Sequence, residues 1–357
     1  MKRLVLIDGN AVLHRAFHAL PPLTTSKGTP VNAVFGFTSM VLKVFKDLVP
    51  DYVACTFDLK APTFRHKEFK AYKATRPKMA DELVGQIPLI HQVVKTMNIP
   101  IFEKEGYEAD DVIGTLARQA KTICHSDPAG RRGKNPVGNS EKVRDPSSRC
   151  NTGTQDENLL EVIIVTGDRD TLQLVDENTK VYCPLKGLSN PVLYDENLVK
   201  QKYGLIPSQL IDYKTLMGDP SDNVPGISGI GPKTAAELLQ KYGSIEGIYQ
   251  NLELIKGSIK DKLKAGEKDL KLAKRLVTII LDAPITLNLE KCRLADYDWN
   301  KVVALFRELE FNTLIPRLPM DIHEFKVKMQ STKGKKPASG RLRRPTAGKD
   351  ENQLGLF

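Results

Sequence analysis

Apolar, β-branched runs alternate with helical patterns through residues 1–200, and this alternation constrains the fold more than any other feature of the chain. We expect strands over 3–10, 51–58, 99–106 and 160–170, and helices over 32–49, 83–98, 108–123 and 299–311. Strands that alternate with helices indicate βαβ units. The sequence therefore predicts an α/β fold, in which a mostly parallel central sheet is flanked by helices and ligands bind beyond the carboxyl ends of the strands.

Residues 124–158 interrupt this pattern because they are rich in Gly, Pro, Ser, Asn and charge and nearly lack large apolar side chains. We expect a disordered surface insertion there. A chain of 357 residues is long enough for two domains, each with its own core. We expect a core domain over 1–200, a helical subdomain over 201–320 and a flexible basic tail over 326–357.

The charge, the cysteine content and the lack of long apolar runs indicate which partners and which cellular location to expect. The net charge of +10 and the pI near 9.2 favour a polyanionic partner. The five cysteines are odd in number and form no Cys-x-x-Cys pair, so we expect neither disulfides nor a zinc site. The N-terminal apolar run is too short for a signal peptide, and no run reaches the length of a membrane span. These features favour a cytoplasmic protein. The sequence has no coiled-coil seam, so we expect a monomer.

Acidic residues recur where the expected strands and neighbouring helices end or begin. There are nine: Asp8, Asp58, Glu108, Asp110, Asp111, Asp168, Asp170, Asp219 and Asp222. Any single one has an ordinary alternative role as a turn former or helix cap. Together they would repel one another and raise each other's pKa unless cations lay among them. Oxygen ligands without paired His or Cys favour Mg²⁺ or Mn²⁺, and two such ions about 4 Å apart suit phosphodiester hydrolysis.

Several stretches in one order carry a specific resemblance: LVLIDGNAVLHRAFHALPPL, FRHKEFKAYKATRP, GYEADDVIGTLA, TGDRDTLQLV and LMGDPSDNVPGISGIGPKTA. They resemble the 5′ nuclease domain of bacterial DNA polymerase I, within the flap endonuclease family. The resemblance covers residues 1–318 apart from the insertion, and we expect a free-standing chain. It implies a PIN-like nuclease core and structure-specific 5′ to 3′ exonuclease and flap endonuclease activity in replication and repair. It also implies that all nine acids bind two or more divalent metal ions.

The segment TFRHKEFKAYKATRPK interleaves cations with aromatic residues. A solvated helix face is one interpretation, and contact with a single-stranded 5′ end is the other. The resemblance implies that this segment is the base of a helical arch over the active site. It implies that Lys73 and Arg76 stabilise charge on the scissile phosphate. Arg65, Lys70 and Tyr72 are further candidates for contact with DNA.

The glycine-rich segment GISGIGPKTA lies between two expected helices. An ordinary turn is the simplest interpretation, but it resembles a helix-hairpin-helix element that holds duplex backbone, often with K⁺ on the loop carbonyls. The expected DNA contacts are Gly226, Gly229, Gly231, Lys233 and Thr234. Because these would be phosphate contacts, we expect no sequence preference.

The peptide QLGLF at 353–357 resembles the short motif by which bacterial proteins bind the sliding clamp. Gln353, Leu354, Leu356 and Phe357 would then enter an apolar groove, and the basic tail would act as a tether. A chance apolar terminus is the alternative.

Two other functions compete with the flap nuclease that these motifs predict, and a third overlaps with it. A non-catalytic DNA-binding adaptor recruited to the clamp would keep the hairpin and the tail but lose the acids. An RNA-specific nuclease would not need the hairpin and arch. A ribonuclease H-type activity on hybrids overlaps with the leading hypothesis and stays open.

Overall fold

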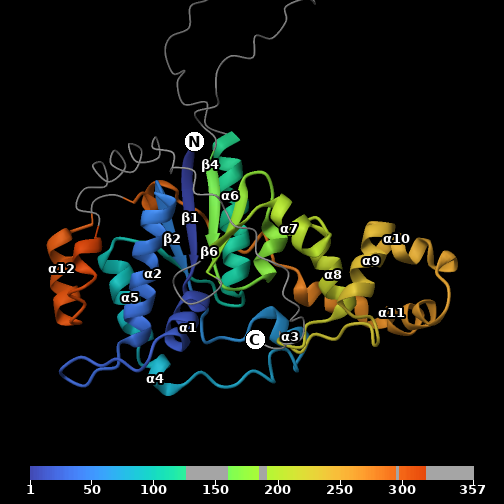
Figure 1. Ribbon diagram of the computed structural model, residues 1–357, viewed down its shortest axis with the longest axis horizontal. Coiled ribbons are helices and arrows are strands. Elements are labelled where there is room, and N and C mark those ends of the chain that lie inside the picture. Colours follow the sequence, from blue (N-terminus) through green and yellow to red (C-terminus); the bar gives the residue numbers. More distant parts are fainter. Residues whose placement is uncertain (126–159, 185–190, 295–296, 319–357) are drawn as a thin grey trace, which may run out of the picture.

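The protein is described by a computed structural model over residues 1–125, 160–184, 191–294 and 297–318 (Figure 1). A six-stranded sheet at its centre has the order β3-β2-β1-β4-β5-β6. The strands are β1 (Lys2–Asp8), β2 (Tyr52–Thr56), β3 (Ile101–Phe102), β4 (Leu160–Val165), β5 (Thr179–Pro184) and β6 (Pro191–Tyr194). All neighbouring pairs are parallel except β5 and β6. The predicted α/β class with a mostly parallel sheet is confirmed.

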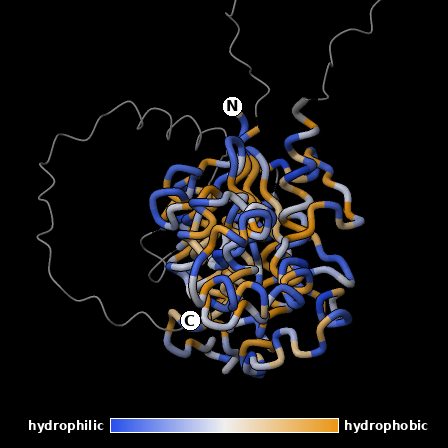
Figure 2. The backbone as a smooth tube through the Cα atoms, turned by 90° about the vertical axis from the view of Figure 1, so that its right-hand side faces the viewer, coloured by the Kyte–Doolittle hydropathy of each residue, from blue (hydrophilic) through white to orange (hydrophobic). Residues whose placement is uncertain are grey.

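Helices cover both faces of the sheet. One face packs against α1 (Gly9–Ala19), α2 (Asn32–Leu48), α5 (Ile87–Thr96) and α12 (Trp299–Glu308), and the other against α6 (Ala109–His125). Because both faces are buried, β1 and β4 are almost continuously apolar instead of alternating. Val5 and Ile7 of β1 point into one core, whereas Leu4 and Leu6 point into the other. Figure 2 shows hydrophobic segments gathered inside the molecule.

The region after β2 differs from its expected form. Only α3 (Phe64–Glu68) and α4 (Asp81–Val84) are helical there, and residues 69–80 form turns and irregular backbone. The resemblance implied a helical arch that begins in this segment, but α3 is the only helix at its base. The expected helix over 83–98 is also divided into α4 and α5, because Pro88 in the first turn of α5 has no N–H with which to continue the preceding helix. The Gln86 side chain, in the turn between the two helices, accepts the backbone N–H of Ala33 at 2.8 Å.

Within the range expected for the helical subdomain, 201–320, α12 packs against α5, whereas a group of other helices lies beside the sheet, on the right in Figure 1. This group contains α7 (Glu196–Tyr203), α8 (Gln209–Met217), α9 (Pro232–Tyr242), α10 (Ile245–Gln250) and α11 (Ser258–Val277). Short 3₁₀ turns occur at η1 (Asp170–Leu174), η2 (Leu252–Leu254), η3 (Glu290–Cys292) and η4 (Ile315–Arg317). In the described ranges, no helix is both long enough and apolar enough to cross a membrane.

Candidate active site

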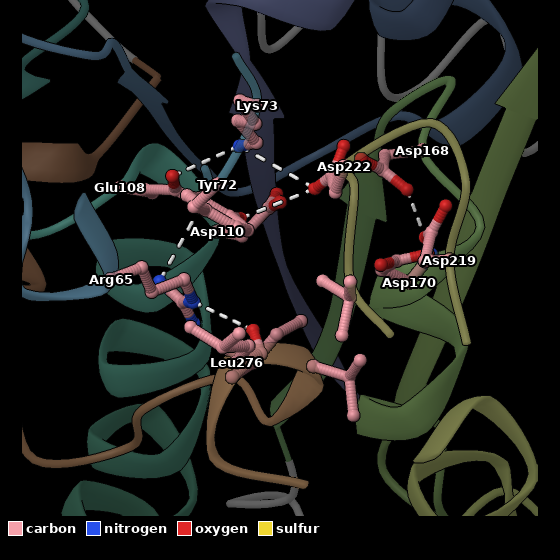
Figure 3. A pocket seen from close by; sticks show the side chains of 13 residues that line it. Arg65, Tyr72, Lys73, Glu108, Asp110, Asp168, Asp170, Asp219, Asp222 and Leu276 are labelled. Atoms are coloured by element: carbon pink, nitrogen blue, oxygen red, sulfur yellow. Dashed lines mark hydrogen bonds and ion pairs between the residues drawn. The ribbon is translucent and has the colours of Figure 1, made fainter. Parts of the chain in front are cut away.

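Acidic side chains from distant parts of the chain meet at the carboxyl edge of the sheet (Figure 3). They come from the loop after β4, the start of α6 and the turn after α8, and the irregular segment after α3 faces them. The pocket between them is lined by Arg65, Tyr72, Lys73, Glu108, Asp110, Asp168, Asp170, Asp219 and Asp222, with an apolar wall of Val224, Leu276, Val277 and Ile279. Parallel strands bring their carboxyl ends to one edge, which explains why these residues meet.

Asp8 lies beside this pocket, where β1 passes directly into α1. Its Oδ1 caps the helix by accepting the N–H of Ala11 at 2.9 Å, and its Oδ2 accepts the hydroxyl of Thr166 at 2.7 Å. The same hydroxyl accepts the N–H of Asp168 at 3.0 Å. Thr166 therefore ties the ends of β1 and β4 together. Burial, with smaller contributions from Asp58 and Asp168, raises the pKa of Asp8 to about 7.

Asp58 follows β2 and is exposed. It accepts the side-chain amide of Asn10 and the first N–H of α6, from Ala109, both at 2.6 Å. The next residue of α6, Asp110, faces the pocket. Burial and the nearby Asp168 raise the pKa of Asp110 well above its ordinary value.

A second set of carboxylates is paired with cations of the chain. Lys214, on α8, forms ion pairs with Asp170 and with Asp219, whose Oδ2 is 2.8 Å from the ammonium nitrogen. Burial and Asp168 nevertheless raise the pKa of Asp170 to about 7. Although burial opposes the effect, Lys214 and Ser221 hold the pKa of Asp219 below its ordinary value.

Lys73 and Arg76 form ion pairs with the remaining acids of the pocket, Glu108 and Asp222. The Lys73 ammonium lies 2.9 Å from Glu108 Oε1 and 3.8 Å from Asp222 Oδ2, and Arg76 forms an ion pair with Asp222. Burial lowers the pKa of Lys73, but Glu108 and Asp222 outweigh it, so the net pKa is raised. The Tyr72 hydroxyl lies 3.2 Å from carboxylate oxygens of both Glu108 and Asp222.

Two hydrogen bonds join the turn that carries Lys73 to the turn after α8. Lys73 has a left-handed backbone (φ 55°), and its N–H donates to the carbonyl of Asp222 at 2.9 Å. Asn223 is also left-handed (φ 57°), and its side-chain amide donates to the carbonyl of Ala71 at 2.8 Å. Non-glycine residues rarely adopt this conformation, so the surrounding contacts must hold it.

Asp111 and Arg65, predicted as a metal ligand and a DNA contact, bind each other in the structure. Asp111 is fully buried, and both of its oxygens accept hydrogen bonds from Arg65, at 2.7 and 2.8 Å. They also accept the N–H groups of Glu108 and Ile280. This geometry argues against Asp111 as a metal ligand. Arg65 is only 3% exposed, which likewise argues against a DNA contact.

Of the other predicted DNA contacts, some are buried and others are exposed. Tyr72 is buried against the acids, whereas Lys70 and Lys233 are exposed. A Cβ on Gly226 would lie 2.3 Å from the nitrogen of Gly218, so packing within the hairpin explains this glycine.

The rest of the hairpin stays open to the predicted phosphate contacts. Gly231 precedes Pro232, the first residue of α9, and a Cβ there would meet nothing within 4 Å. Thr234 is half-buried in the first turn of α9, and the Gly229 carbonyl accepts the ammonium of Lys262 at 3.1 Å. The tail residues Gln353, Leu354, Leu356 and Phe357 lie outside the described residues.

Sequence reasoning missed Lys214, Thr166 and Asn10. Lys214 lies on α8, but Asp219 follows the end of this helix at Met217, so helical periodicity does not predict their contact. Thr166 and Asn10 also had no signal, because their partners are set by strand pairing.

Sequence comparison relates this chain to known proteins. Two family models match, "5'-3' exonuclease, N-terminal resolvase-like domain" over residues 3–127 and "5'-3' exonuclease, C-terminal SAM fold" over residues 205–300. DNA polymerase I of Caldicellulosiruptor bescii is 42% identical over 92% of this chain, and that of Bacillus subtilis is 37% identical over 90%. The aligned region covers only 35% and 33% of those relatives, so the chain spans about a third of their length.

Two solved structures share the fold. A T5 5′-exonuclease with bound zinc has a TM-score of 0.57 at 16% identity, covering 92% of this chain and 99% of that one. A T5 flap endonuclease in a pseudo-enzyme-product complex with DNA and metal ions has a TM-score of 0.56 at 16% identity, covering 94% and 100%. At these identities the likeness concerns the fold alone.

Proposed function

Because this chain belongs to the 5′-3′ exonuclease family, we propose that it is a structure-specific 5′ to 3′ exonuclease and flap endonuclease acting on DNA in replication and repair. The observation that carries the proposal is the pocket in which carboxylates of both family domains meet Lys73. Asp110 and Asp168 come from the sheet domain, and Asp219 and Asp222 come from the turn after α8. A pocket of this composition suits hydrolysis of a phosphodiester bond.

The donor set fits divalent ions with a preference for oxygen, Mg²⁺ or Mn²⁺. The candidate ligands are Asp8, Asp58, Glu108, Asp110, Asp168, Asp170, Asp219 and Asp222. Burial, with a smaller contribution from neighbouring carboxylates, raises the pKa values of Asp8 and Asp110, and a bound cation would stabilise their charged forms. Among the described residues, no three ligating side chains already surround one point, so an ion would have to compete with Lys73, Arg76 and Lys214. When bound, two such ions activate water and stabilise the leaving oxygen.

Lys73 and Arg76 act on the scissile phosphate in this proposal. Arg76 is half-exposed (47% of its side chain), so its guanidinium can reach a phosphate oxygen. The raised pKa of Lys73 keeps its ammonium charged at neutral pH. Positioned cations of this kind stabilise charge that develops in the transition state.

The hairpin between α8 and α9 binds the duplex in this proposal. The N-terminus of α9 offers unpaired backbone N–H groups beside Gly231, and the exposed Lys233 adds charge. A similar fold has been solved with DNA. A K⁺ ion on the hairpin carbonyls remains a prediction, and the ammonium of Lys262 already binds the carbonyl of Gly229.

The decisive experiment incubates the full chain with a 5′-labelled flap duplex, in Mg²⁺ and separately in excess EDTA, beside a single strand of the same sequence. We expect cleavage at the flap junction only with Mg²⁺ or Mn²⁺. Tight flap binding without cleavage under either metal would favour the non-catalytic adaptor instead. A flap with RNA at its 5′ end tests the hybrid-cleaving alternatives in the same assay.

Residues 353–357 are the basis of a second proposal, that the chain binds the bacterial sliding clamp as a cytoplasmic, nucleoid-associated monomer. Gln353, Leu354, Leu356 and Phe357 would be the anchors. Removal of these five residues should abolish binding to purified clamp and leave flap cleavage without clamp unchanged. Equal clamp binding by both forms would contradict the proposal.

A further inference from the structure

After α11 the chain runs along α6 as an extended segment, residues 277–287, which we name the strap. Beyond Val277, the last residue of α11, it forms neither helix nor strand. Ile279, Ala283 and Leu287 are buried, whereas Leu281 is exposed. A buried backbone without a ladder must satisfy its N–H and C=O groups in another way.

Two glutamine amides supply part of what a neighbouring strand would supply. The Gln173 side chain donates to the carbonyl of Val277 and accepts the N–H of Ile279, both at 3.0 Å. The Gln119 amide makes the same pair of bonds, both 2.7 Å long, with residues 285 and 287. Each amide thus joins the carbonyl of one strap residue to the N–H of the second residue after it.

α6 supplies the bonds between these two points. Asp111 Oδ1 accepts the N–H of Ile280 at 2.9 Å, and the Thr115 hydroxyl accepts the N–H of Ala283 at 3.1 Å. Asp111, Thr115 and Gln119 are four residues apart along α6, so they line one face of the helix. The face therefore follows the strap for two helical turns.

Packing requires the strap to lie close to α6. A Cβ on Gly114 would lie 2.8 Å from Ile279 Cγ2 and 3.2 Å from the carbonyl oxygen of Ile280. Any larger residue at 114 would push the strap outward. Gly114 and the polar side chains thus specify one position of the strap on α6.

The strap connects the two parts of the proposed nuclease. Leu276 at the end of α11, labelled in Figure 3, and Val277 and Ile279 at the start of the strap form part of the apolar wall of the acid pocket. The preceding helix α11 reaches the hairpin, where Lys262 binds Gly229. Asp219 and Asp222 lie in the turn that leads into the hairpin, whereas Asp110 lies on α6. The position of the strap on α6 therefore affects the distance between the duplex-binding hairpin and Asp110, and a misplacement of about 1 Å can cost roughly 100-fold in rate.

We propose that the strap fixes the register of cleavage, with Gln119, Thr115 and Gln173 as positioning residues that set which bond next to the junction is cut. The proposal rests on the proposed nuclease function and adds a determinant of its specificity. None of these three side chains lines the described pocket, so their effect on register would pass through the backbone of the strap.

The test compares the full wild-type chain with a double variant, Gln119→Ala with Thr115→Val, on a 5′-labelled flap in Mg²⁺ at single-nucleotide resolution. We expect the share of the principal product to fall at least about twofold, with new cuts at neighbouring positions and a loss of roughly 10-fold in kcat/KM. Thr115→Ser, which keeps the hydroxyl, should restore the wild-type pattern in the single-residue comparison with Thr115→Val. Gln201→Ala, at an exposed position on α7, is the matched control.

A lower unfolding temperature with an unchanged cut position would overturn the proposal, since a merely structural role predicts that result. Hydrogen exchange on the wild-type chain gives a readout that needs neither cleavage nor a folded variant. Flap DNA in EDTA should slow exchange at Ile280, Ala283 and Leu287, and unchanged exchange there would also overturn the proposal. Failure of the wild-type chain to cut the flap would instead contradict the nuclease function, and slowed exchange would then show only that DNA binding affects the strap.

Discussion

The two halves of the acid pocket hold carboxylates by different means. The strand-end half, Asp8, Asp58 and Asp168, is held by backbone N–H groups and by the neutral side chains of Asn10 and Thr166. The cation-paired half, Glu108, Asp170, Asp219 and Asp222, is held by Lys73, Arg76 and Lys214. Neutral donors fix geometry but leave most of the charge in place, whereas cations cancel it.

One carboxylate from each half illustrates this difference. The pKa of Asp8 is raised to about 7, whereas the pKa of Asp219 is lowered. Asp170 belongs to the cation-paired half through Lys214, but its N–H also donates to Asp168, and burial together with Asp168 raises its pKa to about 7. The comparison teaches that Asp8 depends more on an added cation than Asp219 does.

The largest effect should come from the strand-end half. Asp8→Asn keeps the size of the side chain but removes a charge that a divalent ion would need. We expect flap cleavage to fall roughly 1,000-fold or more, equivalent to about 4 kcal/mol of transition-state stabilisation, with flap affinity nearly unchanged. Single-turnover rates and binding titrations measure the two quantities. Asp81→Asn, an exposed acid on α4, is the control, and an Asp8→Asn rate close to wild type would remove Asp8 from the ligand set.

Lys73→Met probes the cation-paired half. We expect the cleavage rate to fall roughly 100-fold with little change in flap affinity, because the ammonium acts on charge that develops in the transition state. Lys70→Met is the matched comparison, since Lys70 is exposed three residues earlier. It should weaken binding by a few-fold at most and reduce its salt dependence, with the maximal rate intact. The reverse split between the two lysines would contradict their assignment.

The sequence predicts some features of the pocket and misses others. The strand ends are local features, so alternating patterns located β1, β2 and β4 and hence the acids beyond them. The same reasoning could not distinguish Asp111 from its neighbour Asp110. Both follow Glu108 at the start of α6, and only the tertiary contact with Arg65, 46 residues away in sequence, separates them.

The strap shows the same limit more strongly. Its backbone partners are side chains of α6 and η1, more than 100 residues away in sequence. No periodicity marks such a segment, because it is neither helix nor strand. β5 and β6 were also missed, and they lie at the edge of the sheet that the first three strands do not reach.

Lys214→Met should expose the dependence of the cation-paired half on its own lysine. Without the ammonium, Asp170 and Asp219 repel each other, and we expect the free energy of unfolding in EDTA to fall by about 2 kcal/mol. Divalent metal should reduce this loss because an ion can replace the missing charge. Urea unfolding with and without Mn²⁺ measures both values. Lys200→Met, on the last turn of α7, is the control, and an equal loss with and without metal would contradict the idea.

The smallest effect is a pH dependence that belongs to the strand-end half. The pKa of Asp8 is raised from 3.8 to about 7 in the folded chain, so protonation below that pH favours the folded state. In EDTA, lowering the pH from 8 to 6 should therefore increase the free energy of unfolding by about 1.4 kcal/mol through this group. Asp8→Asn should lose that increment, whereas Lys73→Met should keep it. Because saturating Mg²⁺ would hold Asp8 ionised, the metal should also suppress the increment, and an increment that persists in Asp8→Asn would assign it to another buried carboxylate.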